Sequence, residues 1–312
     1  QSTMLPLEEI EQLTYKTSAA RCQGCQNHCM LTVSVFPGGR RHVSGNRCEK
    51  ALRGESAAKP GENIFAYKRE RMFAYPPLEP ENAPRGEIGI PRVLNMYENY
   101  PFWATFFRGL GFRIILSPFS TRAIYELGME SIPSESECYP AKLAHGHAQW
   151  LIDHGVKTIF HPCVFYEHQE VPGAQNHFNC PIVVSYPENI KNNVEAVTDG
   201  SVRYLHPFLA FTNEKVASDR LVQFCKEVWN IPEKETRHAA HLAWEEQRRA
   251  KADVRAAGAK ALADMEKNGG SGIVLAGRPY HVDPEINHGI PELIAAYVLT
   301  VLTEDCLPID FV

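Results

Sequence analysis

Short apolar runs alternate with longer amphipathic segments from Pro91 onward. The apolar runs are typical of short buried strands, and they lie at 93–96, 111–116, 155–160 and 181–185. The segments between them carry apolar residues at helical spacing, at 100–110, 120–128 and 138–154. Strand–helix alternation of this kind predicts a parallel sheet covered by helices, of Rossmann or flavodoxin type. We therefore predict a doubly wound α/β domain over residues 91–207.

The pattern becomes helical over residues 208–270, which we interpret as a helical connector. Its part from Ala239 to Lys267 is rich in Ala, Glu, Lys and Arg, and Gly269-Gly270 would end the helix. A strand at 272–276, a helix at 290–299 and a strand at 301–303 then predict the start of a second α/β domain, over residues 271–312. Because the chain begins with Gln1 and stops at Val312 within an apolar stretch, we expect this domain to be truncated.

Residues 1–60 differ from the rest because they contain four cysteines and a hairpin pattern. Residues 31–36 alternate like a strand, Pro37-Gly38-Gly39 supplies a turn, and residues 41–44 would return as the partner strand. We predict a small cysteine-rich metal-binding module here. Residues 61–90 are rich in Pro, Glu and Arg and are interpreted as a connector.

Composition and charge limit the classes of protein to which this chain can belong. The chain of 312 residues has a net charge of −5, which argues against a general nucleic-acid binder. No apolar run approaches the roughly 18 residues that span a bilayer, and the polar N-terminal residues do not form a signal peptide. We therefore expect a cytoplasmic protein that is not bound to a membrane. Nine cysteines in such a protein favour metal or redox chemistry over disulfides.

The first cysteine cluster has the spacing C-x2-C-x3-C, followed by a fourth cysteine after the predicted hairpin. Its members are Cys22, Cys25, Cys29 and Cys48. Four thiolates at one point form a soft tetrahedral site that suits either Zn²⁺ or a [4Fe–4S] cluster, and the spacing does not decide between them. Buried free thiols or disulfides are the alternatives. His28 lies inside the triplet and is interpreted as a neighbour of the site.

Cys138 and Cys163 form a second candidate site. Cys138 precedes a predicted helix and Cys163 follows a predicted strand, so both are expected at the ligand-binding end of the sheet. Two thiolates there could anchor an iron–sulfur cluster, with Lys142 offsetting its negative charge; the alternative is that each is a small buried hydrophobe. Cys306, after a strand of the second domain, is either a third ligand or a core residue. Cys180 and Cys225 are predicted not to be ligands, since Cys180 precedes a predicted strand and Cys225 lies on a predicted helix.

The segment from Gly277 to Gly289 joins a predicted strand to a predicted helix, which is the ligand-facing position in α/β proteins. It offers polar side chains for anion or metal contacts: Arg278, His281, Asp283 and His288. The alternative is a rigid loop whose path is set by Pro279 and Pro284. The segment lacks the glycine pattern of nucleotide-binding loops, and no hydrolase or kinase motif occurs in the chain.

These segments together resemble the acyl-CoA dehydratase activase-related family of large bacterial proteins. The resemblance covers roughly residues 20–312, and it rests on 22–29, 45–49, 137–142 and, most specifically, 277–289. In such proteins this region typically follows activase-like ATPase domains. The biochemically known relatives are subunits of 2-hydroxyacyl-CoA dehydratases and benzoyl-CoA reductases, which have two α/β domains with a [4Fe–4S] cluster between them.

The resemblance implies that three cysteines hold that cluster. Two would come from the first domain, in contexts like those of Cys138 and Cys163, and the third from the second domain, beyond Val312. In the relatives an ATP-driven activator passes one electron to the cluster, which reduces the acyl-CoA thioester and lets the hydroxyl leave. By this resemblance the chain is a segment of a dehydratase-type lyase or acyl-CoA reductase that works with a fused or separate ATPase. The alternatives are an electron-transfer module without an acyl-CoA substrate, and a non-catalytic scaffold whose four N-terminal cysteines hold structural zinc.

Overall fold

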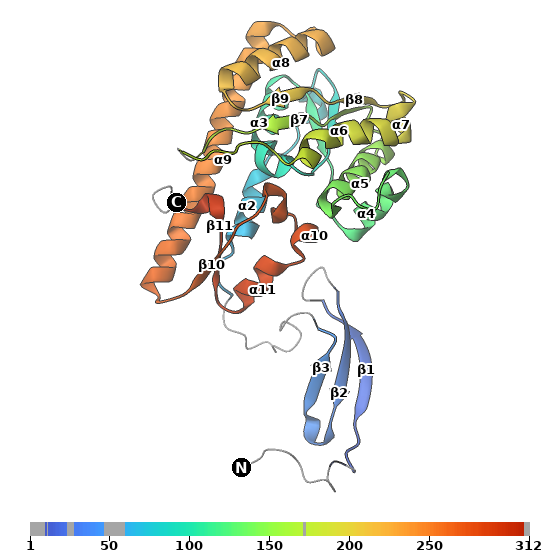
Figure 1. Ribbon diagram of the computed structural model, residues 1–312, viewed down its shortest axis with the longest axis vertical. Coiled ribbons are helices and arrows are strands. Elements are labelled where there is room, and N and C mark those ends of the chain that lie inside the picture. The colour runs from blue at the N-terminus through green and yellow to red at the C-terminus, as the bar shows by residue number, and fades with distance from the viewer. Residues whose placement is uncertain (1–9, 11, 24–27, 47–59, 171–172, 309–312) are drawn as a thin grey trace.

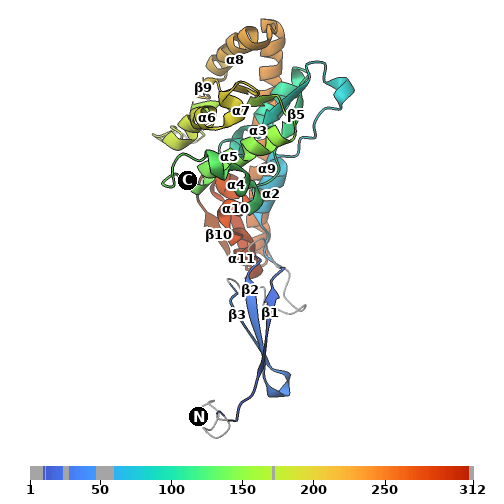
Figure 2. The ribbon, with the colours of Figure 1, turned by 90° about the vertical axis from the view of Figure 1, so that its right-hand side faces the viewer.

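A computed structural model describes residues 10, 12–23, 28–46, 60–170 and 173–308 of the chain. Figure 1 shows an elongated three-stranded sheet below a larger body of helices and parallel strands, and the longest helix runs along one side of that body. Figure 2 shows the same arrangement from the side. Among the described residues, no helix is both long enough and apolar enough to cross a membrane.

The central sheet has four parallel strands. In spatial order they are β5 (Arg113–Leu116), β4 (Glu87–Ile90), β6 (Thr158–Phe160) and β8 (Arg203–Leu205). The first strand along the chain, β4, therefore lies between the second and the third, which is the strand order of flavodoxin-like sheets. In such sheets the crevice for ligands opens where the order reverses, here at the carboxyl ends of β4 and β6.

Helices cover both faces of this sheet, as the side chains of β4 illustrate. Ile88 and Ile90 are fully buried in an aromatic core together with residues of three helices, α3 (Met96–Gly109), α8 (Glu214–Trp229) and α9 (Glu233–Lys267). Gly89 faces the other way, where a Cβ would meet Leu151 of α5 (Tyr139–Asp153). Strands buried on both faces are typical of parallel sheets. The predicted α/β class is confirmed for this part of the chain.

Two strands of the central sheet continue beyond a proline. After Pro162, β6 is followed by β7 (Cys163–Tyr166), and after Pro207, β8 is followed by β9 (Phe208–Ala210). The ladder bridges the interruption, because the His161 N–H donates to Leu205 O at 2.8 Å and the Cys163 N–H donates to Pro207 O at 2.9 Å. Helix α6 (Pro181–Asn193) packs against β7.

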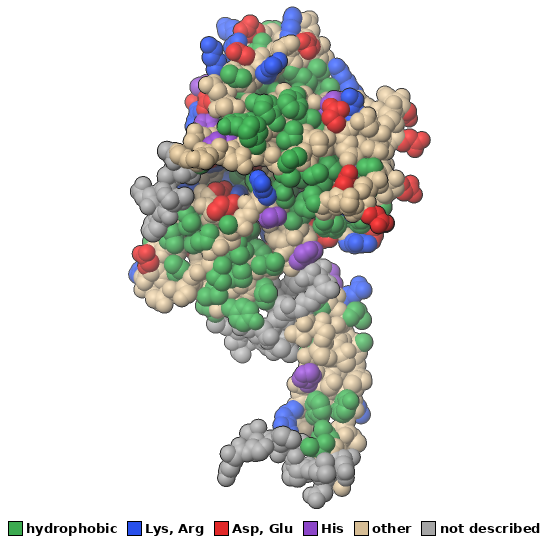
Figure 3. Space-filling model, viewed as in Figure 1, with side chains coloured by type: hydrophobic (Ala, Val, Ile, Leu, Met, Phe, Trp, Pro, Cys, Tyr) green, Lys and Arg blue, Asp and Glu red, His purple; other side chains and the backbone are tan. Residues whose placement is uncertain are grey.

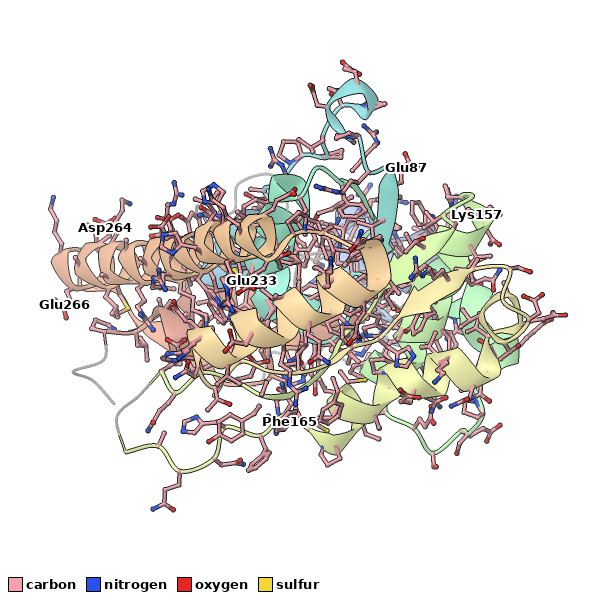
Figure 4. All side chains as sticks on the ribbon, turned by 90° about the horizontal axis from the view of Figure 1, so that it is seen from above. Glu87, Lys157, Phe165, Glu233, Asp264 and Glu266 are labelled. Carbon is pink, nitrogen blue, oxygen red and sulfur yellow. The ribbon has the colours of Figure 1, made fainter. Side chains whose placement is uncertain are left out.

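The C-terminal unit is built around β10 (Gly272–Leu275) and β11 (Thr300–Thr303), which pair in parallel. Residues 61–63 lie along β11 on the side opposite β10, because Asn63 forms a parallel bridge to Val301. Asn63 is followed by α2 (Ile64–Met72). Helix α9 contacts both units, and Figure 4 shows it running from Glu233, close to α8, to Asp264 and Glu266 at its far end. Ile273 and Val274 of β10 are exposed, and Figure 3 shows apolar side chains gathered on this part of the surface.

The N-terminal sheet is an antiparallel meander of β1 (Lys16–Arg21), β2 (Met30–Val35) and β3 (Arg41–Ser44). The predicted hairpin of residues 31–44 is confirmed, whereas β1 was not expected. The remaining helices are short: α4 (Arg122–Gly128), α7 (Glu195–Thr198), α10 (Pro284–Asn287) and α11 (Ile290–Ala296). Single 3-10 turns lie at Pro37–Gly39, Pro80–Asn82, Met129–Ser131, Pro279–Val282 and Glu304–Cys306.

Several predicted elements are wrong. The strand predicted at 181–185 is the first turn of α6, because Pro181 at the first helical position starts a helix and Val183 packs into a core of helices. The strand predicted at 93–96 is a turn, in which Leu94 has a φ of 49°. The strand of this region is β4, inside the predicted connector, and α2 also falls there. β8 was not predicted.

Candidate functional site at the carboxyl edge of the parallel strands

Cys138 and Cys180 begin two neighbouring helices. Cys138 is the N-terminal cap of α5 and Cys180 that of α6, and neither thiol makes a capping hydrogen bond. Both thiols act on the phenol of Tyr280, whose pKa is raised first by burial and then by the charges of Cys180 and Cys138. The positive ends of two helix dipoles, on the neighbouring helices α5 and α6, therefore each lie at a cysteine.

The turn that carries Cys138 is fixed by its neighbours. The Glu137 carboxylate accepts hydrogen bonds from Tyr186 Oη at 2.5 Å and from Asn189 Nδ2 at 2.8 Å, both on α6. Lys142 donates from Nζ to the Glu135 carbonyl at 2.6 Å, so its ammonium group closes the same turn. These contacts hold the start of α5 against α6.

Cys163 lies in a different environment. It is buried at the start of β7, and its Sγ is within 4.8 Å of a Glu188 oxygen on α6 and a His206 nitrogen after β8. Burial first, and then the Glu188 carboxylate, raise the pKa of the Cys163 thiol to about 11. Among the described residues this is the one group of three Cys, His, Asp or Glu side chains within such a distance. The structure thus brings Cys163 together with Glu188 and His206, whereas Cys138 and Cys180 begin two helices, α5 and α6, that pack against each other.

Asp283 anchors the Gly277–Gly289 segment to the central sheet. Its fully buried carboxylate accepts hydrogen bonds from the hydroxyls of Tyr97 and Ser120, and from the Glu285 N–H at 2.9 Å. Burial raises the pKa of Asp283, and the three donors oppose that shift. Tyr139, the first residue of α5, also bonds to Glu285 at 2.8 Å, so the cysteine edge and this segment are joined twice.

A chain of hydrogen bonds continues from Ser120 into the sheet. Since Ser120 donates to Asp283, it accepts from His147 Nε2 at 2.9 Å. His147 Nδ1 then accepts from Ser117 Oγ at 2.8 Å, and Ser117 Oγ accepts from the Arg92 N–H at 2.8 Å. Burial lowers the pKa of His147 to about 3, so its imidazole is neutral and every bond in the chain has one direction.

A pocket of about 270 Å³ opens at the carboxyl ends of β10 and β11. Its charged and polar lining comes from Lys68, Arg278, His281, Asn287, Thr303 and Glu304, and apolar residues of α2, of the end of β10 and its loop, and of α10 and α11 complete it. Lys68 is buried and paired with Asp305 at 2.6 Å. The predicted residues Arg278 and His281 thus line one pocket.

His281 is held by its own loop. The Arg278 N–H donates to His281 Nδ1 at 3.1 Å, and burial, followed by the charge of Arg278, lowers the pKa of the imidazole. A Cβ at Gly277 would lie 2.3 Å from Nδ1, so glycine is required for this contact. The neutral imidazole therefore carries its proton on Nε2, where it can donate to a bound group.

The N-terminal cysteines are partly described. The Cys22 N–H donates to Cys29 O at 2.9 Å, so these two residues lie opposite each other where β1 and β2 meet. Cys25 and Cys48 lie outside the described residues, and the four-cysteine site stays a prediction. Cys306 is buried against α9 beside Gly258, and Cys225 is buried in the aromatic core.

Sequence reasoning missed Cys180, Glu188 and His206 as members of these groups. The pair Cys180-Pro181 carries a usable signal, because proline at a first helical position marks a helix start and would have moved Cys180 to the same kind of place as Cys138. Nothing in the sequence pairs Glu188 with His206, since their contact arises only when α6 packs against β7, the strand beside the segment that carries His206.

Comparison with known protein families shows to which family the chain belongs. Residues 87–307, more than half of the 312-residue chain, match the model of the family described as the CoA enzyme activase uncharacterised domain (DUF2229). The chain belongs to this family. Searches of curated proteins and of solved structures gave no match. The matched span includes the central sheet, all three cysteines of its carboxyl edge and the Gly277–Gly289 segment; the N-terminal meander lies outside it.

Proposed function

We propose that this chain is a redox segment of an ATP-coupled acyl-CoA enzyme, and that Cys138 and Cys180 hold an iron–sulfur cluster at the carboxyl edge of the sheet. The observation that carries the proposal is the pair of cysteines that cap the N-termini of the two packed helices α5 and α6. Membership of a CoA enzyme activase family supplies the context for an activase-like ATPase, fused or separate, as the electron donor.

The donor set fits a cluster in its chemistry. Both thiols are free of capping bonds, and helices of 15 and 13 residues direct their N-terminal N–H groups and dipoles toward them. A bound [4Fe–4S] cluster would supply a one-electron carrier whose negative charge these dipoles stabilise. No group of three cysteines converges in the described part of the chain, so at least one further ligand has to come from elsewhere.

The surrounding residues have separate tasks in this proposal. Glu137 and Lys142 fix the turn of Cys138, and Asp283 fixes the Gly277–Gly289 segment beside it. Lys142 would also offset the negative charge of the cluster. The pocket at Arg278 and His281 offers a cation and a neutral N–H donor for the carbonyl or an anionic group of an acyl-CoA.

Iron loading under anoxic conditions tests the proposal. The chain is reconstituted with iron and sulfide in a Cys22→Ser/Cys25→Ser/Cys29→Ser/Cys48→Ser background, which removes the N-terminal thiols from the measurement. We expect visible iron–sulfur absorption and bound iron, both reduced at least severalfold by Cys138→Ser and by Cys180→Ser. Cys225→Ser, at a buried site in another core, is the matched control. Equal iron content in all variants would overturn the assignment.

A second candidate function is a scaffold in which the N-terminal cysteines hold structural zinc. It is favoured by the position of Cys22 and Cys29 on opposite sides of one hairpin end, bonded at 2.9 Å through their backbones. A zinc site can stabilise a module too small to form its own core. One zinc per chain, lost together with the fold of the meander in Cys29→Ser, and no iron in anoxic preparations would favour this candidate.

A further inference from the structure

We propose that Cys163, Glu188 and His206 form a binding site for one divalent transition-metal ion of the zinc class, with one coordination position left open. This site is separate from the pair of Cys138 and Cys180. It does not depend on the proposed redox function, and it assigns to Cys163 a role other than that of a cluster ligand.

The backbone places two of the three side chains on adjacent strands. Cys163 follows β6 and His206 follows β8, and these strands pair in register through Phe160 and Leu205. Pro162 and Pro207 interrupt both strands at the same level, and the Cys163 N–H bonds to Pro207 O at 2.9 Å. The two donors thus lie at the carboxyl edge of the sheet, the usual ligand-binding position of such folds.

The third donor is oriented by its own contacts. Glu188 comes from α6, which packs against β7, and its Oε1 lies 2.7 Å from His206 Nδ1. Its other oxygen, Oε2, lies 3.4 Å from Lys191 Nζ, so the lysine holds the carboxylate from the side away from the imidazole. Outer contacts that fix a ligating carboxylate in this way are typical of metal sites.

The imidazole is positioned as well. The ring of His206 stacks on Tyr204, with centroids 5.8 Å apart and planes 27° from parallel. Tyr204 is itself fixed, since its hydroxyl lies 2.7 Å from His161 Nδ1. The ring of His206 therefore keeps its orientation without a metal, which lowers the entropy cost of binding one.

The chemistry of the donor set selects the kind of ion. One thiolate, one imidazole and one carboxylate suit zinc, cobalt(II) or iron(II), whereas calcium and magnesium prefer oxygen ligands alone. Thiolate and carboxylate together balance the two positive charges of the ion. Three protein ligands leave a fourth tetrahedral position for water or a substrate atom. The side chain of Glu188 is 47% exposed, so solvent can reach this position.

Cobalt(II) binding tests the site, because a cobalt–thiolate bond gives a charge-transfer absorption band. The full chain is titrated with cobalt(II) in the same background without the four N-terminal cysteines. We expect one equivalent bound with a thiolate band. Cys163→Ser should abolish the band, and Glu188→Gln and His206→Asn should raise the Kd about tenfold or more.

Matched controls separate this site from the others. Cys138→Ser and Cys180→Ser should keep the band, as should Glu195→Gln, an exposed glutamate on the next helix. Glu188→Gln and His206→Asn alter partly exposed side chains and leave the cores untouched, so they remain informative if Cys163→Ser fails to fold. A titration without a thiolate band, or unchanged binding in all three site variants, overturns the proposal whatever the result of iron loading.

Discussion

The hydroxyl of Tyr97 donates a hydrogen bond to the carboxylate of Asp283, although 186 positions separate the two residues in the chain. Tyr97 lies in the first turn of α3, and Asp283 caps α10 in the C-terminal unit. Both side chains are buried, and burial together with the neighbouring Asp283 charge raises the pKa of the tyrosine. This contact, together with the hydrogen bond from Ser120 to the same carboxylate, fixes the loop with Arg278 and His281 relative to the central sheet.

Tyr97→Phe tests this anchor. The substitution removes one of three donors to a buried carboxylate while it keeps the ring in its core, so the free energy of unfolding should fall by about 1–3 kcal/mol. Urea unfolding measures the change. Tyr67→Phe, on the partly exposed surface of α2, is the control and should leave stability within about 0.5 kcal/mol. If the two variants unfold at the same urea concentration, the anchor contributes nothing.

Gln247→Ala should destabilise the junction of α9 and α3. Pro101 interrupts α3, and the buried amide of Gln247 accepts from the Phe102 N–H at 3.1 Å and donates to Glu98 O at 2.8 Å. Alanine would leave both backbone groups without that partner in a dry core, at a cost of about 2–4 kcal/mol. Thermal or urea unfolding reports this loss. Gln223→Ala, an exposed change on α8, should shift stability by less than about 0.5 kcal/mol.

Sequence patterns predicted the elements in which local preference and tertiary packing agree. The helix expected at 138–154 is α5, and the strands expected near 111–116, 155–160 and 272–276 contain β5, β6 and β10. The two apolar runs that were wrongly predicted as strands form the start of a helix and a turn. Val183 and Leu94 reach the same core from a helix and from a turn, because burial needs an apolar side chain and not a particular backbone.

The candidate site was predictable only in part, because its surroundings depend on tertiary packing that sequence patterns do not show. Cys138 and Cys163 follow from the rule that ligands bind at the carboxyl ends of parallel strands. Which residues surround each sulfur depends on the packing of α6. That helix carries Glu188 to Cys163 and begins after Cys180, and the sequence pattern predicts its first five residues as a strand.

Glu167→Gln should change how stability depends on pH. Three amide groups, those of Asn95, Asn99 and Asn179, donate to Glu167 Oε1, while burial and then the Glu98 charge raise the pKa of this carboxyl to about 7. Above about pH 5 the unfolded chain has lost this proton, whereas the folded chain releases it only as the pH passes about 7. Stability therefore falls as pH rises from about 5, and the loss is nearly complete at about pH 8.

The Glu167→Gln variant has no titrating carboxyl at this position. Compared with this variant, the unsubstituted chain should lose about 1–3 kcal/mol of its free energy of unfolding between about pH 5 and about pH 8. Urea unfolding at several pH values measures the difference. Glu81→Gln, at an exposed position, should run parallel to the unsubstituted chain. A constant difference between Glu167→Gln and the unsubstituted chain across this range would contradict the assignment.

Gly258→Ala tests how closely α9 approaches the C-terminal unit. Alanine favours a helix over glycine by about 1 kcal/mol, but a Cβ here would lie 2.3 Å from the Cys306 carbonyl oxygen and 2.7 Å from its Sγ. The helix or the turn must move, so we expect a net loss of about 1–3 kcal/mol in urea unfolding. Gly109→Ala, whose Cβ would meet Ala239 at 3.4 Å, is the matched control and should be neutral or slightly stabilising. Equal effects of the two changes would show that α9 and the turn at Cys306 are not in tight contact.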